Sequence, residues 1–358
     1  MVLASVKKSQ SYVATLQQHP ELWDRFTLKE EYHPKFRDKY GRFPDYLSSN
    51  RDFFEPAVSR FLFENDLIHP EWPEGKKFAV CLTHDIDGIY PYRGLEILPA
   101  SALMFMRKKS ADAAKALFSH ANKKLSPWYN LEELMELERM YDATSSFYFL
   151  ALDEGEIDFN YDVSEIADVA GTLIDDGWEV GLHGSRKAFD DAERMVLEKQ
   201  RLENVLGKEV VGYRNHYLCF QTPDTWHHLK KAGFLYDTTL GYDGVIGFRN
   251  GMCHPFRPFD LEKNTEIDGI WELPLAIMDC TLLGEYYMRL VPDQAWLQTK
   301  KMIDTVAELG GVLTILWHNT YIEGKNLSFY ERVLKYCSEK KAWMTIGEEI
   351  GKWWSKKQ

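Results

Sequence analysis

The chain has 358 residues, of which 45% are hydrophobic and 27% are charged, and its formal net charge at pH 7 is −12. This length and hydrophobic content suffice for one large domain or two smaller ones. The negative charge and the lack of a basic stripe argue against a nucleic-acid partner. The five cysteines are odd in number and scattered, and Cys81, Cys219 and Cys280 fall inside or beside apparent strands, which is typical of reduced, buried thiols. We therefore expect a cytoplasmic protein, and the absence of a CxxC pair argues against a structural zinc site. No apolar stretch reaches the length of a membrane span or of a secretory signal core.

Residues 1–75 are rich in aromatic and charged side chains and are interrupted by prolines, which predicts an N-terminal extension packed on the rest. Helical pieces are expected around Ser5–Gln18 and Phe54–Asp66. From Phe78 onward, apolar strands alternate with helical patterns. The expected strands are Phe78–Leu82, Thr144–Leu150, Trp178–Leu182, Val210–Tyr213, Leu235–Thr239, Trp271–Met278, Gly311–Trp317 and Trp343–Ile346. The expected helices are Asn130–Tyr141, Val163–Asp176, Asp190–Leu206, Pro223–Ala232, Pro292–Leu309 and Ser328–Cys337.

Strands that alternate with helices of this length predict parallel βα units. Seven or eight such units over residues 76–350 predict an α/β fold, a distorted (β/α)7–8 barrel with the site at its carboxyl mouth. The segment Arg93–Ser126 is expected to be a long helical insertion after the first strand, forming a lid or flank.

Polar side chains stand where several predicted strands end. The first strand runs into His84, Asp85 and Asp87. Three later strands end in residues of the same kind, namely His183, Arg214 with His216, and His318. Taken singly, each is as well explained by a turn or by a hydrogen-bonded core side chain. Together, Asp and His ligands suit Zn²⁺ or another divalent metal that activates water, with a free Asp as general base and a distal His as general acid.

Other polar residues lie at or near the predicted strands. Arg249 lies in the glycine-rich run Gly247–Gly251, which suits the binding of an anionic group, although a surface arginine is an equal alternative. Asp237, Glu272 and Asp279 flank apolar stretches, where a turn or simple exposure competes with a role in the site. The candidate substrate-binding residues are Arg249, Asp237, Glu272, Asp279 and His84.

Over about residues 76–346, the order of these runs resembles the polysaccharide deacetylase family, also called carbohydrate esterase family 4 or the NodB homology domain. The family's first motif, Thr-Phe-Asp-Asp, corresponds to Thr83-His-Asp-Ile-Asp87. This match implies that Asp85 is the general base and Asp87 a metal ligand. The second motif, His-Ser/Thr-x-x-His, is matched in His183, but Lys187 occupies the position of its second histidine.

The third motif's arginine, which orients the base, falls on Arg214, and His216 stands where the family usually has proline. The fifth motif, Leu-x-His, is Leu316-Trp-His318, which implies that His318 is the general acid. The fourth motif has no counterpart. Because adjacent strand ends of a barrel converge on one mouth, we hypothesise that His216 completes the metal set with Asp87 and His183.

The runs "GLHGS", "GYRNHYLCF", "YDTTLGYDGVIGFRNG", "ELPLAIMDCTL" and "LWHN" resemble a divergent branch associated with bacterial surface-polysaccharide synthesis. The resemblance implies a hydrolase that removes an N-acyl group, expected to be acetyl, from an amino sugar, with zinc as the expected metal. A cytoplasmic location favours a nucleotide- or lipid-linked precursor of O-antigen or capsule. Two alternatives remain: a metal-free, non-catalytic carbohydrate-binding relative, and a glycoside hydrolase with paired carboxylates at Glu272 or Asp279. The sequence does not predict an oligomeric state.

Overall fold

The computed structural model of the chain describes residues 12–91, 119 and 122–357. Its central feature is a nine-stranded sheet in the order β8-β5-β4-β3-β2-β1-β10-β9, and β11 additionally pairs with β1. All of these pairs are parallel. The strands of this sheet are β1 (Phe78–Ile86), β2 (Ser146–Leu150), β3 (Glu179–Gly184), β4 (Gly212–Asn215), β5 (Tyr236–Asp237), β8 (Trp271–Glu272), β9 (Leu275–Met278), β10 (Val312–Leu316) and β11 (Ala342–Thr345).

The sheet closes into a barrel through one short stretch of chain. β8 pairs with β5 and β9 pairs with β10, so residues 271–278 belong to both ends of the sheet. Between them, Leu273 N donates to Asp237 O, and Leu275 N donates to Leu240 O. β11 pairs with the first residues of β1, whereas β2 pairs with its last ones. The fold is therefore the distorted (β/α)7–8 barrel that the sequence predicts.

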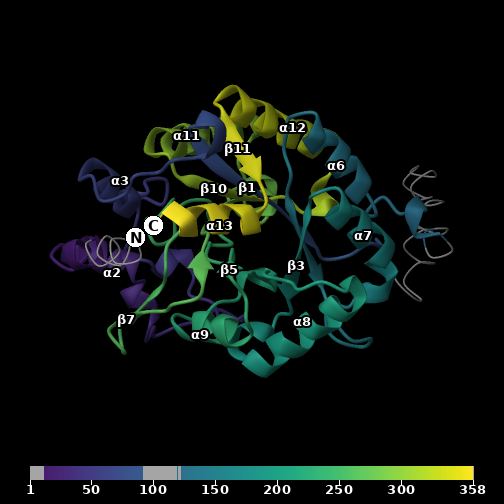
Figure 1. The fold of residues 1–358 in the computed structure, drawn as a ribbon, viewed down its shortest axis with the longest axis horizontal. Helices are drawn as coiled ribbons and strands as arrows, with labels where there is room; N and C mark the ends of the chain where they lie inside the picture. The colour runs from purple at the N-terminus through teal and green to yellow at the C-terminus, as the bar shows by residue number, and fades with distance from the viewer. Residues whose placement is uncertain (1–11, 92–118, 120–121, 358) are drawn as a thin grey trace.

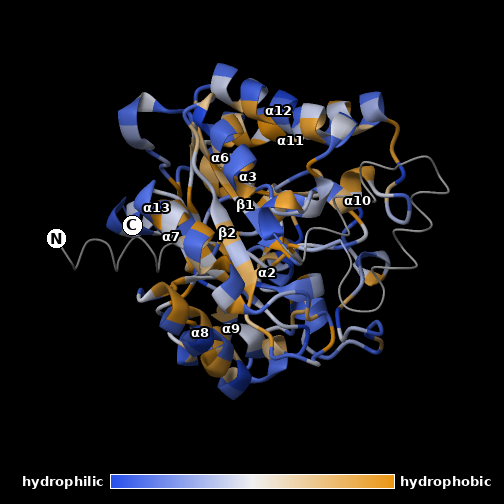
Figure 2. Cartoon of the chain, turned by 90° about the vertical axis from the view of Figure 1, so that its right-hand side faces the viewer, coloured by the Kyte–Doolittle hydropathy of each residue, from blue (hydrophilic) through white to orange (hydrophobic). Residues whose placement is uncertain are grey.

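Helices surround the strands (Figure 1), and their outward faces are mainly hydrophilic, whereas β1 and β2 between them are mainly apolar (Figure 2). The longer helices on this outer layer are α6 (Leu131–Arg139), α7 (Ala167–Asp175), α8 (Ala192–Leu206), α9 (Asp224–Lys231), α11 (Pro292–Leu309) and α12 (Gly324–Glu339). The remaining helices are α2 (Pro20–Phe26), α3 (Ala57–Glu64), α10 (Asp279–Leu283) and α13 (Gly347–Lys357). A separate antiparallel pair consists of β6 (Phe259–Asp260) and β7 (Thr265–Glu266). None of the described helices combines the length and apolar character needed to cross a bilayer.

Tyrosines fill the barrel interior and face glycines. The hydroxyls of Tyr148 on β2 and Tyr236 on β5 lie 3.1 Å apart across the barrel. A Cβ atom at Gly181 would come within 2.4 Å of the Tyr148 ring, and one at Gly212 within 2.2 Å of the Tyr236 hydroxyl. Only glycine leaves room for these rings. Arg214 packs on the Tyr148 ring, with its guanidinium carbon 5.1 Å from the centre of that ring.

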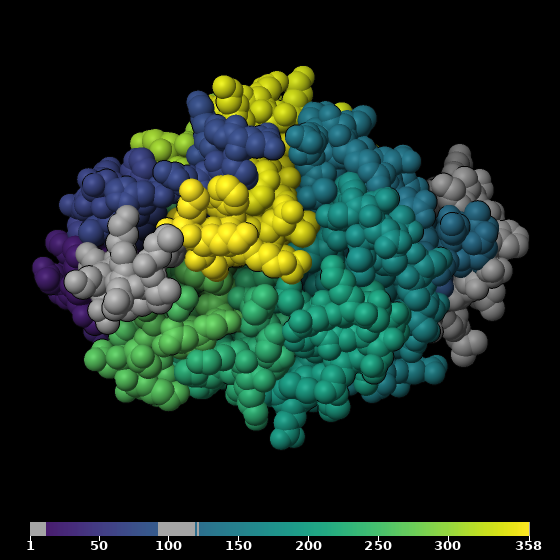
Figure 3. Space-filling model, viewed as in Figure 1, coloured from purple at the N-terminus to yellow at the C-terminus, as the bar shows by residue number. Residues whose placement is uncertain are grey.

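The described part of the N-terminal segment, residues 12–75, packs against the barrel. Its Glu31 forms a buried bidentate pair with Arg249, with Nε–Oε1 at 2.9 Å and Nη2–Oε2 at 2.5 Å. Glu71 O accepts from Trp353 Nε1 of α13 at 2.6 Å, and Figure 3 shows this segment beside the C-terminal helix. Most of the expected insertion Arg93–Ser126 lies outside the described residues. Its described end contains a short 3₁₀ turn, Lys123–Leu125.

Candidate active site

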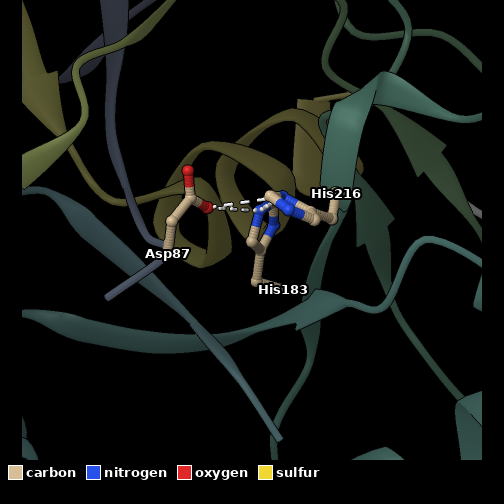
Figure 4. A group of neighbouring side chains, drawn as sticks. All are labelled: Asp87, His183 and His216. Atoms are coloured by element: carbon tan, nitrogen blue, oxygen red, sulfur yellow. Dashed lines mark hydrogen bonds and ion pairs between the residues drawn. The ribbon is translucent and has the colours of Figure 1, made fainter. Parts of the chain in front are cut away.

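Side chains from three strand ends meet at the carboxyl end of the barrel. Asp87 follows β1, His183 is in β3, and His216 directly follows β4. Each offers one ligand atom, and these atoms all lie within 4.8 Å of one another (Figure 4). Asp87 Oδ1 is 3.2 Å from His183 Nε2 and 3.3 Å from His216 Nδ1. The two nitrogens are 3.0 Å apart. Residues far apart in the sequence thus share one cluster.

This cluster fits a divalent metal. Asp87 Oδ1 is buried and accepts no hydrogen bond from any residue that the structure describes. His183 Nδ1 lies 3.1 Å from the Arg214 carbonyl oxygen, which can only accept, so the ring carries its proton on Nδ1 and turns the Nε2 lone pair toward the cluster. Zinc ligands at 2.0–2.1 Å in tetrahedral geometry stand about 3.3 Å apart. The three observed separations are close to that value, so the donor set and its spacing suit zinc.

The local electrostatics favour the metal-binding forms of Asp87 and His216, whereas a metal at His183 would have to displace a proton. Burial alone would raise the pKa of Asp87, but the His216 and His183 imidazoles outweigh it and hold that pKa well below its usual range. Burial lowers the pKa of His216 to about 4, because the Asp87 carboxylate compensates only in part. Burial would also lower the pKa of His183, but Asp85 and Asp87 outweigh it and raise it. At neutral pH the cluster therefore holds a carboxylate and a neutral His216.

Asp85 is held beside this cluster by a buried arginine. Arg214 Nη1 donates to Asp85 Oδ1 at 3.1 Å and to Thr83 Oγ1 at 2.6 Å. The other oxygen of Asp85, Oδ2, lies 3.6 Å from His183 Nε2. Because a buried carboxylate is costly without a counter-charge, the arginine supplies that charge and fixes the orientation of Asp85. This arrangement leaves Asp85 Oδ2 directed toward the metal cluster.

His318 stands opposite, just after β10. Its Nδ1 donates to Asp279 Oδ1 at 2.7 Å, and its backbone N donates to Asp279 Oδ2 at 2.6 Å. Burial would lower the pKa of His318, but the Asp279 carboxylate outweighs it and raises it to about 10. The free nitrogen, Nε2, lies 3.8 Å from Asp87 Oδ2. Asp279, expected to bind substrate, here orients His318.

These groups surround a pocket with a cavity of 190 Å³. Asp85, Asp87, His216 and His318 line it, and His183 lies just behind. Sequence reasoning missed the rest of the wall, which includes Arg42, Tyr217, Asp243, Tyr287 and Tyr321. Tyr217 is adjacent to His216, and Asp243 lies in a run quoted for the family resemblance, so both had a local signal. Arg42 comes from the N-terminal segment, where no strand pattern indicates a site.

Arg249 does not reach the pocket. Its Nε and Nη2 donate to Glu31, its Nη1 donates to the Gly241 carbonyl, and the residue is buried. The glycine of its loop serves a close approach between backbones: a Cβ at Gly247 would come within 2.3 Å of Phe53 O. The glycine-rich run therefore accommodates the N-terminal segment, and the structure does not support the expected anion-binding role of Arg249.

Asp237 and Glu272 also lie outside the pocket. They are register partners on β5 and β8, and both are fully buried. Glu272 Oε2 accepts from Trp226 Nε1 at 2.8 Å, and Asp237 Oδ1 accepts from Thr239 Oγ1 at 2.5 Å. Burial raises the pKa of Asp237 to about 6 and raises the pKa of Glu272 well above its usual value. Burial thus shifts both carboxyl groups toward their protonated forms in the barrel wall, and neither lines the pocket.

His84 differs from the expectation in the same way. Its Nδ1 is bonded to the Trp317 carbonyl at 2.7 Å, and its Nε2 is 2.8 Å from Glu138 Oε1 on α6. The side chain is fully buried. Strand alternation explains the placement, because Asp85 points into the barrel and its neighbour must point outward to the helices.

Among solved structures, the chain is similar to the proposed polysaccharide deacetylase of Mycobacterium smegmatis, with a TM-score of 0.54, 17% identity and coverage of 80% of this chain and 93% of that chain. It is less similar to the polysaccharide deacetylase of Bacillus cereus (TM-score 0.38, 14% identity, coverage 75% and 91%). A carbohydrate esterase family 4 pseudoenzyme from Bacillus anthracis gives a TM-score of 0.36 at 12% identity, with coverage of 80% and 70%.

Because the last two TM-scores lie below 0.5, the fold assignment depends on the first comparison. Neither protein-family models nor curated proteins give a match to the sequence. The chain thus has the polysaccharide deacetylase fold that its motifs predict. At this level of identity the likeness establishes the fold alone, so the activity must be argued from the site.

Proposed function

We propose that the chain is a metal-dependent hydrolase that removes an N-acyl group, in the first instance acetyl, from an amino sugar. The observation that carries this proposal is the shared pocket, in which a three-residue metal cluster stands beside one carboxylate and one imidazole. Such a set has the parts that hydrolysis of an amide requires, namely a metal site, a base and an acid. The polysaccharide deacetylase fold supports the same reaction class.

Asp87, His183 and His216 would hold the metal. When bound there, a divalent metal polarises the acyl carbonyl and lowers the pKa of a water molecule. Asp85 is the proposed general base, because its Oδ2 faces the cluster and its other oxygen is fixed by Arg214. It takes the proton of the attacking water as that water adds to the carbonyl carbon.

His318 is the proposed general acid. Its Nδ1–H is used by Asp279, so only Nε2 is available to the substrate, and it faces the pocket on the other side of Asp87 from His183. In this position it donates a proton to the sugar nitrogen as the C–N bond breaks, which makes the amine the leaving group. The products are a free amino sugar and the carboxylic acid.

The pocket lining supports an uncharged sugar unit at the reacting end. Arg42 is the arginine that lines the pocket. Its ion pairs with Asp38 and Asp243, at 2.6 and 2.7 Å, already neutralise its charge. The rings of Tyr217, Tyr287 and Tyr321 offer apolar faces suited to sugar C–H groups. A nucleotide- or lipid-linked precursor of a surface polysaccharide, met in the cytoplasm, remains our proposed substrate, with its phosphates outside the pocket.

The test measures release of acetate and of reducing sugar from N-acetylated amino sugars by the zinc-loaded protein. We expect acetate release that stops with a chelator and returns with zinc. Asp85→Asn should lower kcat by about 10²–10⁴-fold while leaving zinc content unchanged. Asp268→Asn, at an exposed carboxylate paired with Arg257, is the matched control and should behave as wild type.

Two other outcomes would overturn the proposal. Reducing sugar released without acetate would indicate a glycoside hydrolase, although the buried position of Glu272 argues against this. Zinc binding absent from the wild type, with sugar binding retained, would indicate a non-catalytic relative. His183→Ala and His216→Ala locate any bound zinc, since each should abolish stoichiometric binding.

A further inference from the structure

His216 stands on an unusual turn. The family position for a second histidine in the β3 motif is Lys187, which is exposed, so the third ligand comes from the turn after β4. The next two residues, Tyr217 and Leu218, have φ values of 59° and 53°. This left-handed conformation is uncommon in residues other than glycine. Contacts from outside the turn must therefore hold it, and with it the orientation of His216.

An arginine from the N-terminal segment supplies the first of these contacts. Arg42 Nη1 donates to the Tyr217 carbonyl oxygen at 2.7 Å. The guanidinium is itself fixed on both sides, by Asp38 at 2.6 Å and by Asp243 at 2.7 Å. Its side chain is only 10% exposed. A buried cation with three partners in fixed positions has little freedom to move, so it defines where the Tyr217 carbonyl lies.

A stack of aromatic rings supplies the second contact. Tyr40 lies on Tyr217 with ring centres 4.7 Å apart and planes 11° from parallel. The His216 ring also contacts the Tyr217 ring, at 4.0 Å between centres. The Tyr217 hydroxyl donates to Asp158 Oδ1 at 3.1 Å. His216 is thus packed against a ring that the N-terminal segment holds in place.

The segment that makes these contacts is rigid in its own right. Asp38 Oδ1 accepts from the backbone N of both Tyr40 and Arg42, each at 2.9 Å. Asp38 N donates to Arg42 O at 2.9 Å, which closes the turn. Gly41 has a φ of 80°, which glycine adopts without strain. Residues 38–42 therefore act as a preformed brace against the His216 turn.

We propose that Tyr40 and Arg42 are positioning residues for the metal ligand His216, so that the N-terminal segment is a part of the metal site. This inference rests on the proposed metal-dependent function. It gives the segment a role that the barrel alone does not provide. With the third ligand on the turn after β4 and not at position 187 after β3, the brace orients the imidazole. Groups that orient a metal ligand in this way affect metal affinity by about 10–100-fold.

The experiment measures zinc affinity by competition with a chelator, using the full chain. Tyr40→Leu removes the stacked ring without leaving a buried charge, and it should weaken zinc binding by about 10–100-fold. Tyr40→Phe keeps the ring and should retain wild-type affinity. Arg42→Met should weaken binding in the same range. Arg60→Met, which breaks ion pairs of the same segment with Glu55 and Glu308, is the matched control and should leave affinity unchanged.

Cobalt-substituted protein provides a second readout, because the visible spectrum of Co²⁺ reports ligand geometry. We expect the spectra of Tyr40→Leu and Arg42→Met to differ from that of the wild type, and those of Tyr40→Phe and Arg60→Met to coincide with it. If Arg42→Met does not fold, the comparison of Tyr40→Leu with Tyr40→Phe tests the proposal by itself. Wild-type affinity and spectrum in Tyr40→Leu would overturn this inference alone, whereas a wild type that binds no zinc would overturn the proposed function.

Discussion

The pocket and the layer behind β1 each contain buried histidines, and the two regions use them differently. His84 and His183 are almost equally buried, at 0% and 1% exposed. Both ring nitrogens of His84 are used by the protein, one by a carbonyl and one by Glu138. His183 uses only Nδ1 in this way and directs Nε2 at Asp87 and His216. A remaining lone pair, and not the degree of burial, distinguishes the candidate metal ligand from the core residue.

Glu138 forms the centre of the region behind β1. Its Oε1 accepts from Tyr330 on α12 at 2.8 Å, and its Oε2 accepts from Ser145 and Trp178, each at 2.8 Å. With His84 included, every partner of this carboxylate is a protein group, so nothing is left for a ligand to complete. By the same criterion the metal cluster is incomplete, because the buried Asp87 Oδ1 accepts no hydrogen bond from the described residues. A buried cluster whose hydrogen-bonding groups are all satisfied by the protein indicates a structural role, whereas a cluster with an unsatisfied buried group indicates a ligand-binding site.

The largest expected effect is that alanine at His84 lowers stability, whereas alanine at His183 abolishes zinc binding. His84→Ala should lower the free energy of unfolding by about 3–5 kcal/mol, because it leaves the buried Glu138 without its imidazole partner. His183→Ala should abolish zinc binding and acetate release while leaving the metal-free protein nearly as stable as wild type. Urea denaturation of the metal-free proteins and zinc analysis measure the two effects. A loss of zinc in a stable, folded His84→Ala protein would refute the distinction.

The sequence predicted the barrel because its strands are apolar runs that end in polar residues, a local signal that tertiary packing did not override. The same signal indicated Asp87, His183 and His216, because neighbouring strand ends of a barrel lie close together. It did not separate them from His84, because the direction of a side chain depends on strand register. Alternation within β1, with Asp85 taken as inward, provides that information and would have turned His84 outward.

Arg249 and Arg42 show what the sequence could not provide. Both are buried arginines with carboxylate partners, and in each case the pairing joins the N-terminal segment to the barrel. The partners are more than two hundred residues apart, at Glu31 with Arg249 and at Arg42 with Asp243. No periodic pattern links such positions, so a glycine-rich loop was read as an anion site and the brace at residues 38–42 was missed.

A second saturated histidine allows a test by pH. His254 is fully buried, with Nδ1 at 2.9 Å from Ser59 Oγ and Nε2 at 3.1 Å from Leu309 O. Burial lowers its pKa from 6.5 to about 4. The folded state therefore keeps His254 neutral over a range in which the unfolded chain binds a proton, so stability must fall as pH drops from 6.5 toward 4. Between pH 7 and pH 5 this residue should account for a loss of about 2 kcal/mol.

His254→Gln cannot titrate, so its unfolding free energy should fall by about 2 kcal/mol less than that of the wild type over the same pH interval. Urea denaturation at both pH values gives the difference, and the contributions of other groups are common to both proteins and cancel. Equal pH dependence in the two proteins would mean that His254 takes up its proton in the folded state over the same pH range as in the unfolded chain. A protonated ring at this position would show that its two partners do not saturate it.

The smallest expected effect comes from removing one bond of the Glu138 network without creating a charge. Tyr330→Phe deletes the hydroxyl that donates to Glu138 Oε1 and that lies 3.4 Å from His84 Nε2. His84 still partners the same oxygen, so the cost should be that of one hydrogen bond, about 1 kcal/mol in unfolding free energy. Zinc affinity and kcat should not change, since the network and the pocket lie on opposite faces of β1. A variant with wild-type stability but altered kcat would mean that the two regions are coupled through β1, and that saturation alone does not separate them.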